Sequence, residues 1–241
     1  FIVKNGQKYF THFFPLIKNN LVKNISNLQF YIYGNNSSDN TKKILQKFSF
    51  TNVVDLGCGE GAWIDDYKKL GFKKLIGIDI SEERLKIAKN NGLSEIYCCN
   101  GKEMPFDDGS IDCLISNNVL INVIQDQDKL DILKESKRIL NNKGIFIFSF
   151  CPTKSFKYKK LDHCSTVSIN EMKKMVLDSG LKINRIIPCY FTFPRVGANP
   201  KFASFSSKFV FPITDILLRK FSDPDMAKVV YFSVSVNSNS I

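Results

Sequence analysis

Histidine, arginine and tryptophan are scarce in this chain of 241 residues, which contains two histidines, five arginines and one tryptophan. The seven cysteines form no Cys-x-x-Cys pair, so the spacing that is typical of a zinc site is absent and we expect no metal. No uninterrupted apolar run is long enough to predict a membrane span. These absences favour a soluble, cytoplasmic protein with reduced, buried thiols.

The formal net charge of +11 comes mainly from lysine, which supplies 29 of the 34 cationic residues. Basic faces attract polyanions, but phosphate recognition is typical of clustered arginines with interleaved aromatic side chains. The lysines are instead spread along the chain. We therefore expect no nucleic-acid partner, and an anionic small-molecule substrate stays open.

Residues 51–81 predict a strand, a glycine turn, an amphipathic helix and a second strand that ends in an acid. The turn contains Gly57, Gly59 and Gly61, and the acid is Asp79. Alternating glycines let a ligand approach the backbone at a helix N-terminus, and an acid at the tip of the next strand can accept both hydroxyls of a ribose. The pattern therefore predicts a nucleoside cofactor.

Asp55, two residues before the first glycine, bears on which cofactor this is. A dinucleotide fingerprint can be drawn through Gly57, Gly59 and Ala62, so the glycines alone leave a nicotinamide cofactor open. A carboxylate inside the strand end would repel a pyrophosphate, whereas it would attract a cationic cofactor.

The run from Asp55 to Gly61 (DLGCGEG), followed by Gly77 to Ser81 (GIDIS), resembles the first two motifs of class I S-adenosylmethionine-dependent methyltransferases. The resemblance extends over Thr51 to Phe191 and is to the broad "type 11" small-molecule group. It implies a Rossmann-like, doubly wound α/β fold with a seven-stranded, mostly parallel sheet and an antiparallel last strand. It also implies S-adenosylmethionine as the cofactor and S-adenosylhomocysteine as its product.

The resemblance assigns a role to several residues. Asp79 would hold the ribose, the turn would contact the methionine portion, and Asp55 would face the positive end of the cofactor. Ile80 would cover one adenine face, and Asn100 would meet the adenine edge where relatives have an acid. Ser116 ends the predicted fourth strand and Asn117 follows it, at the edge where open α/β sheets bind ligands. The predicted cofactor-binding residues are Asp55, Gly57, Cys58, Gly59, Gly61, Asp79, Ile80, Asn100, Gly101, Ser116 and Asn117.

No general base stands out in the sequence. Relatives often carry histidine shortly after the fourth strand, but this chain has Ile121 and Asn122 there. His163, next to Asp162 in a lysine-rich loop, is the candidate base. Methyl transfer depends mainly on alignment and desolvation, so the lack of an evident base is compatible with it.

We expect one methyltransferase domain over residues 1–241. Its predicted parts are a helical N-terminal cap (1–50), a cofactor-binding core (51–191), an insertion or lid (192–228) and a last strand with a tail (229–241). The insertion could form a homodimer surface. Within the core, helices are expected to start at Ser81 and Ser168, and a turn is expected over Asn141 to Gly144 before an apolar strand.

The sequence thus predicts methyl transfer by direct displacement to a small-molecule acceptor that is anionic or contains a sugar or phosphate. Three alternatives stay open: a non-catalytic subunit with a cofactor fold, an NAD(P)-dependent oxidoreductase, and an RNA or protein methyltransferase.

Overall fold

The computed structural model describes residues 50–69, 72, 74–153, 164–189, 223–227 and 229–236. Nearly all of the expected N-terminal cap, the candidate base His163 and most of the expected insertion, with its dimer surface, lie outside the described residues. Within the described ranges, no helix is both long and apolar enough to cross a membrane.

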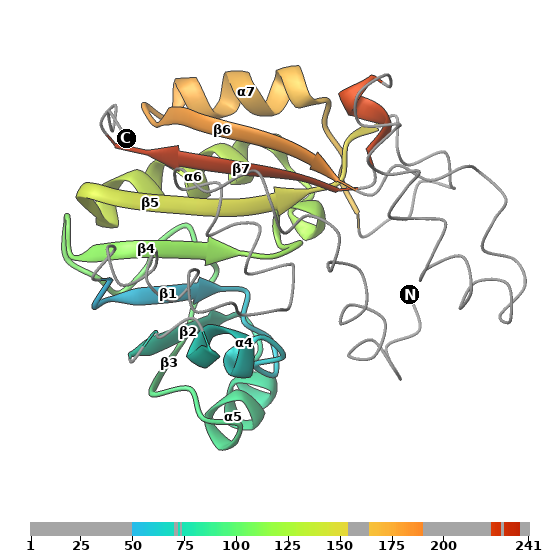
Figure 1. The fold of residues 1–241 in the computed structure, drawn as a ribbon. Helices are drawn as coiled ribbons and strands as arrows, with labels where there is room; N and C mark the ends of the chain where they lie inside the picture. Colours follow the sequence, from blue (N-terminus) through green and yellow to red (C-terminus); the bar gives the residue numbers. More distant parts are fainter. Residues whose placement is uncertain are drawn as a thin grey trace, which may run out of the picture.

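In the described part of the chain, seven strands form one sheet in the order β3-β2-β1-β4-β5-β7-β6 (Figure 1). The pairs among β1 to β5 are all parallel, and β7 runs antiparallel to both β5 and β6. This confirms the predicted Rossmann-like sheet with an antiparallel last strand. The strands are β1 (Val53–Leu56), β2 (Leu75–Asp79), β3 (Glu95–Cys98), β4 (Ile111–Ser116), β5 (Leu140–Phe150), β6 (Lys182–Cys189) and β7 (Val229–Ser235).

Strand order reverses between β1 and β4. The chain runs outward from β1 through β2 to β3 and then returns to place β4 on the other side of β1. In open α/β sheets the ligand crevice lies at such a switch point, outside the carboxyl ends of the strands. The loops that follow β1 and β4 are therefore the expected walls of the site.

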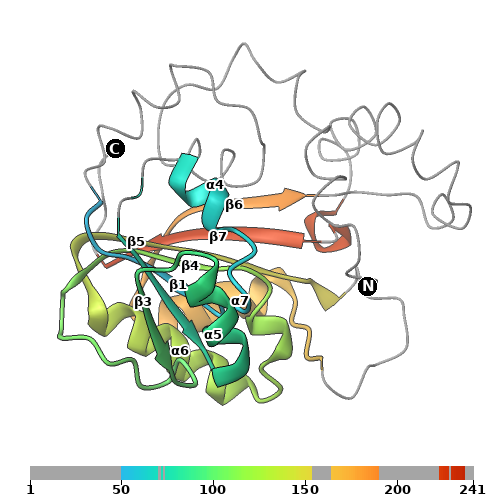
Figure 2. The same cartoon turned by 90° about the horizontal axis from the view of Figure 1, so that it is seen from below.

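Helices cover both faces of the sheet, and Figure 2 shows α4 and α6 on opposite sides. Helices α6 and α7 contribute buried side chains to the same cluster as Leu56, whereas α4 and α5 pack in a second cluster with Val53. The helices are α4 (Ile64–Lys69), α5 (Glu82–Asn90), α6 (Asp126–Ile139) and α7 (Ile169–Asp178), with 3₁₀ turns η2 (Leu120–Asn122) and η5 (Pro224–Met226).

The side chains of β1 alternate between these two clusters, as strand geometry requires. Val54 and Leu56 belong to the cluster with α6 and α7, and Val53 belongs to the cluster with α4 and α5. Asp55 therefore shares the face of Val53, beneath α4, although every neighbour of Asp55 on β1 is apolar. The Asp55 carboxylate therefore lies within the hydrophobic layer between β1 and α4.

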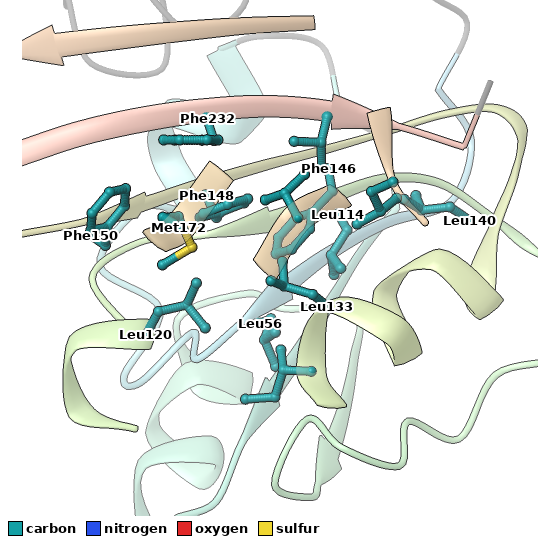
Figure 3. Close-up of a cluster of buried hydrophobic side chains, with 14 of the residues drawn as sticks. Leu56, Leu114, Leu120, Leu133, Leu140, Phe146, Phe148, Phe150, Met172 and Phe232 are labelled. Atoms are coloured by element: carbon teal, nitrogen blue, oxygen red, sulfur yellow. The ribbon is translucent and has the colours of Figure 1, made fainter. Parts of the chain in front are cut away.

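Phenylalanine forms the centre of the larger cluster, shown in Figure 3. Phe148 on β5 lies directly opposite Phe232 on β7, and their stacked ring centroids are 5.3 Å apart. Both side chains are fully buried, and burial of one such side chain stabilises the fold by about 1.5–3 kcal/mol. These contacts hold the antiparallel end of the sheet to its parallel part.

Both predicted helix starts are confirmed. The Ser81 hydroxyl accepts a hydrogen bond from the Arg84 amide and begins α5. Ser168 and Glu171 form a reciprocal capping box at the start of α7. Each cap satisfies backbone donors that the helix itself leaves unpaired.

The predicted turn over Asn141 to Gly144 is wrong as a strand boundary, because β5 begins directly after α6 and includes these residues. The expected turn chemistry is present as an irregularity in the β4–β5 pairing. The register shifts between the pair Ile111 with Leu140 and the next pair, Cys113 with Ile145. The Asn141 side chain accepts a hydrogen bond from the Lys143 amide at 2.9 Å, within the segment of β5 that lies between these two pairs.

Candidate cofactor-binding site

The glycine turn after β1 folds back on the end of β2. The amides of Gly57 and Cys58 both donate to the Ile78 carbonyl, at 2.6 and 2.9 Å. Gly57 has φ +75°, and a Cβ there would overlap the Val119 side chain. Gly59 has φ +54°, but a Cβ there would meet no atom of the described residues within 4 Å. Among the described residues, the turn is therefore packed at Gly57 and open at Gly59, where a ligand could approach.

Four of the five amide hydrogens between Gly57 and Gly61 are already engaged. In addition to the two bonds to Ile78, the Gly59 amide donates to the Asp79 carboxylate and the Gly61 amide donates to the Cys58 carbonyl. A pyrophosphate is bound by free amide donors in such a turn. With these four donors occupied, the turn offers few amides to a pyrophosphate, which argues against the dinucleotide interpretation of the glycines.

Asp79 is fixed across the mouth of the turn. One carboxylate oxygen accepts from the Gly59 amide at 2.9 Å, and the other accepts from the Ser81 amide at 3.0 Å. A carboxylate has about four acceptor positions, so each oxygen keeps capacity for another donor. The side chain is oriented in advance and can accept a pair of hydroxyl groups, such as those of a ribose.

Ile80 follows Asp79 and is 74% exposed, although the strand residues before Asp79 are buried. A large exposed apolar side chain beside an oriented carboxylate offers apolar surface against which a ring could pack. The contact of Ile80 with adenine stays a prediction.

Asn100 and Gly101 lie in the loop that follows β3. Asn100 is exposed, and its side-chain oxygen accepts from the Lys102 amide at 3.0 Å, which is the geometry of a turn residue. The oxygen retains a second acceptor position, so a contact with the adenine edge stays a prediction. Gly101 is buried with φ +77°, and a Cβ there would lie 3.0 Å from Leu56.

Asp55 is 3% exposed, and burial raises its pKa to about 7. A hydrogen bond from the Tyr67 hydroxyl opposes this shift, and the nearby Asp79 carboxylate reinforces it. Tyr67, on α4, is fully buried and was not predicted as a site residue. Its place on the apolar face of the helix made it look like a core residue, and only its hydroxyl distinguishes its role.

Ser116 and Asn117 stand at the end of β4, beside the end of β1. The Asn117 side-chain nitrogen donates to the Tyr67 hydroxyl at 3.5 Å. The Ser116 hydroxyl and the Asn117 side-chain oxygen are buried and find no partner among the described residues. The sequence placed both residues correctly at the end of the fourth strand, but it gave no indication that α4 joins Asn117 to Asp55.

Cys58 was predicted at the site, and the structure places its thiol beneath the turn. The side chain is 5% exposed, and burial, with the nearby Asp55 and Asp79 carboxylates, raises its pKa. Its thiol is therefore packed in the core and unreactive, while the contact of Cys58 with the cofactor stays a prediction. Within the described ranges, no three His, Cys, Asp or Glu side chains gather as a metal site.

Comparison with known proteins places residues 54–148 in a family described as "Methyltransferase domain". The chain is 35% identical over 97 residues to the uncharacterized protein MJ1252 of Methanocaldococcus jannaschii. The matched segment covers 40% of this chain and 36% of that protein. It is 31% identical over 121 residues to protein-lysine N-methyltransferase EFM4 of Saccharomyces cerevisiae (42% and 51%). It is 26% identical over 113 residues to "Probable tRNA methyltransferase 9B" of Mus musculus (46% and 24%).

The chain thus spans about half or less of the length of these relatives. Among solved structures, it resembles the chain found in complex with the Trm112 methyltransferase activator of Haloferax volcanii, with TM-score 0.57, 18% identity and coverage of 81% and 88%. It also resembles the S-adenosylmethionine-dependent methyltransferase TM1293 of Thermotoga maritima, for which histamine N-methylation is suggested, with TM-score 0.56, 18% identity and coverage of 82% and 87%. At these identities the structures establish the fold.

Proposed function

Residues 54–148 belong to the methyltransferase-domain family, and we propose that this chain transfers the methyl group of S-adenosylmethionine to a small-molecule acceptor. The bound cofactor supplies an electrophilic methyl carbon on a sulfonium, and S-adenosylhomocysteine remains when the acceptor has taken that carbon. The acceptor's lone pair forms the new bond as the carbon–sulfur bond breaks. Any proton that the acceptor loses goes to the solvent.

The observation that carries this proposal is the fixed Asp79 carboxylate above the open side of Gly59. The residues present fit the cofactor. Asp79 would accept the ribose hydroxyls, Ile80 would cover the adenine ring, and the buried Asp55 would face the positive charge. Because the turn amides are engaged, the site suits a cation better than a pyrophosphate, which counts against the NAD(P)-dependent alternative.

A small-molecule acceptor is supported by the scattered charge and by the scarcity of arginine. We propose an anionic acceptor that contains a sugar or phosphate, because lysines are frequent in the 153–168 segment. EFM4 and the mouse protein are named for protein and tRNA substrates, so both classes belong in the test. Purified protein with methyl-labelled cofactor should label a pool of small metabolites, while bulk tRNA and cell protein stay unlabelled. Label only in tRNA or protein would overturn the small-molecule proposal.

The cofactor site is tested by calorimetric titration with S-adenosylhomocysteine. Replacement of Asp79 by alanine removes acceptors for two hydroxyls, each worth about 1.5 kcal/mol or more, so Kd should rise about 100-fold. Asp178→Ala, which removes an exposed carboxylate at the end of α7, is the matched control and should bind as the wild type does. If Asp79→Ala kept full affinity while folded, this site would be wrong.

A partner-dependent enzyme is the second candidate. It is favoured by the likeness to the chain solved with the Trm112 activator, and by Asn100 at the position where relatives have an acid. Such an enzyme would bind cofactor weakly alone and more tightly with its partner. Titration of the isolated chain, compared with the chain purified with its native partners, separates the two candidates.

A further inference from the structure

The loop between β3 and β4 contains neither helix nor strand over residues 100–110. Its backbone polar groups therefore need partners from elsewhere in the fold. Helix α6 supplies them from one face, because Asp128, Glu135 and Arg138 are spaced seven and three residues apart. The shape of this irregular loop thus depends on side chains that lie far from it in the sequence.

Arg138 uses every one of its side-chain N–H donors at this place. Its guanidinium donates to the backbone carbonyls of Phe106 at 2.8 Å and Met104 at 3.1 Å, and to the Asp108 carboxylate at 2.6 Å. Its other two bonds go to the two oxygens of Glu135, at 2.8 and 2.7 Å. Because the guanidinium is planar and rigid, five bonds to it fix the relative positions of the groups that accept them.

Glu135 completes the hold on Met104. The Glu135 side chain is 10% exposed, and one of its oxygens accepts from the Met104 amide at 2.6 Å. Met104 is therefore bound through both its amide and its carbonyl, and its side chain is buried in the core. The hydrogen bond from Arg138 lowers the pKa of Glu135, so this carboxylate stays ionised at neutral pH.

The anchor at Met104 is close to Asn100, the predicted contact with the adenine edge, since only residues 101–103 lie between them. The Lys102 amide donates to the Asn100 side-chain oxygen at 3.0 Å and fixes which end of that side chain is the acceptor. Lys102 also pairs with Asp128 on α6, but both side chains are more than a third exposed, and such pairs contribute little. The half-buried cluster of Arg138 and Glu135 is therefore the stronger restraint on the loop.

We propose that Arg138 is a positioning residue that holds the β3–β4 loop where Asn100 can read the base of the cofactor, and so determines the base specificity of this chain. The proposal rests on the proposed function and deepens it. The remaining acceptor position of the Asn100 oxygen suits the exocyclic amine of adenine. Hypoxanthine has an oxygen in place of that amine, so two acceptors would face each other without a hydrogen between them.

The test is titration calorimetry of the full chain with S-adenosylhomocysteine and with S-inosylhomocysteine, which differ only in the base. The wild type should prefer the adenine ligand about tenfold, because the hypoxanthine ligand leaves an acceptor unpaired. Arg138→Lys keeps the positive charge but cannot hold two carbonyls with one ammonium. Its preference should fall to about twofold, mainly through weaker binding of the adenine ligand.

Arg185→Lys is the matched control, because Arg185 is an exposed arginine on β6, at the opposite edge of the sheet from β3. It should keep the tenfold preference. Urea unfolding of the same preparations separates specificity from stability. If Arg138 only stabilised the fold, Arg138→Lys would lower the free energy of unfolding and leave the preference unchanged, which would overturn the proposal.

Asn100→Ala tests whether Arg138 acts through Asn100. The single variant should lose the preference for adenine, and adding Arg138→Lys should lower the affinity for S-adenosylhomocysteine little further, because both changes remove the same contact. Losses that multiply independently would contradict the proposed route through Asn100.

Glu135→Gln is the second variant, in case Arg138→Lys fails to fold. It keeps the shape of the side chain but removes the charge that strengthens its bonds to Met104 and Arg138, so the preference should fall to about fourfold. A tenfold preference in this folded variant, or no preference in the wild type, would overturn the proposal and leave the cofactor site intact. Failure of the wild type to bind either ligand would instead contradict the proposed function.

Discussion

The exposed side chain of Ile80 gives a test in which ligand binding and fold stability separate. Ile80 is 74% exposed, so most of its surface already lies in water and contributes little to the core. Replacement by alanine should change the free energy of unfolding by no more than about 0.5 kcal/mol. If a ring of the cofactor covers one side of Ile80, the same change removes apolar area from the bound state only.

The expected magnitude follows from the area. Burial of a methylene is worth about 0.8 kcal/mol, and a planar ring covers only one side of the truncated side chain, so the loss should be about 1 kcal/mol. This corresponds to about a fivefold rise in Kd for S-adenosylhomocysteine. The assay is calorimetric titration, with urea unfolding of the same preparations.

Leu177→Ala is the matched control, because Leu177 is 60% exposed on α7. It should leave both the Kd and the stability nearly unchanged. Unchanged cofactor affinity in a folded Ile80→Ala variant would refute the assignment of Ile80 to the adenine ring. A loss of more than about 2 kcal/mol of stability would show that Ile80 packs against the fold instead.

Two further predictions concern the turn and the base of the sheet. Gly57→Ala should lower the free energy of unfolding by about 1–3 kcal/mol, because φ is positive at Gly57 and the Val119 side chain occupies the space of a Cβ. Gly59→Ala should mainly weaken ligand binding. Urea unfolding measures the first effect and ligand titration measures the second. Partial burial raises the pKa of Asp112, but hydrogen bonds from Asn52, Thr51 and Asn141 outweigh it and lower the pKa overall. Asp112→Ala should therefore lower the free energy of unfolding by about 2 kcal/mol at pH 7. The difference between wild type and variant should shrink as the pH falls below 4, because the wild-type carboxyl then takes up a proton. An equal difference at pH 3 would contradict the account.

Features that depend on nearby residues could be predicted from the sequence. Ser81 and Ser168 begin helices because a capping hydroxyl bonds to amides only three residues away. Gly57 and Asp79 could be placed because a buried parallel strand, a glycine turn and a terminal acid form one continuous pattern. In each case the information lies within one short segment.

Features that depend on packing between distant segments could not be predicted. Tyr67 has the pattern of a core residue, and its contact with Asp55 depends on how α4 lies on β1. The start of β5 depends on its pairing with β4, in which the register shifts between Ile111 and Cys113. The sequence therefore predicted the local hydrogen bonding of Asn141 correctly but placed the start of the strand too late. His163 lies outside the described residues and remains a prediction.

The most direct test of the central claim is a crystal structure of the chain with S-adenosylhomocysteine bound. We predict that the ribose hydroxyls contact Asp79, that the adenine ring lies on Ile80, and that the amino group faces Asp55 and Asn117. The glycine turn should keep its bonds to Ile78, because its donors are already engaged in the free chain. A ligand bound elsewhere, or one whose amino group points away from Asp55, would contradict the account.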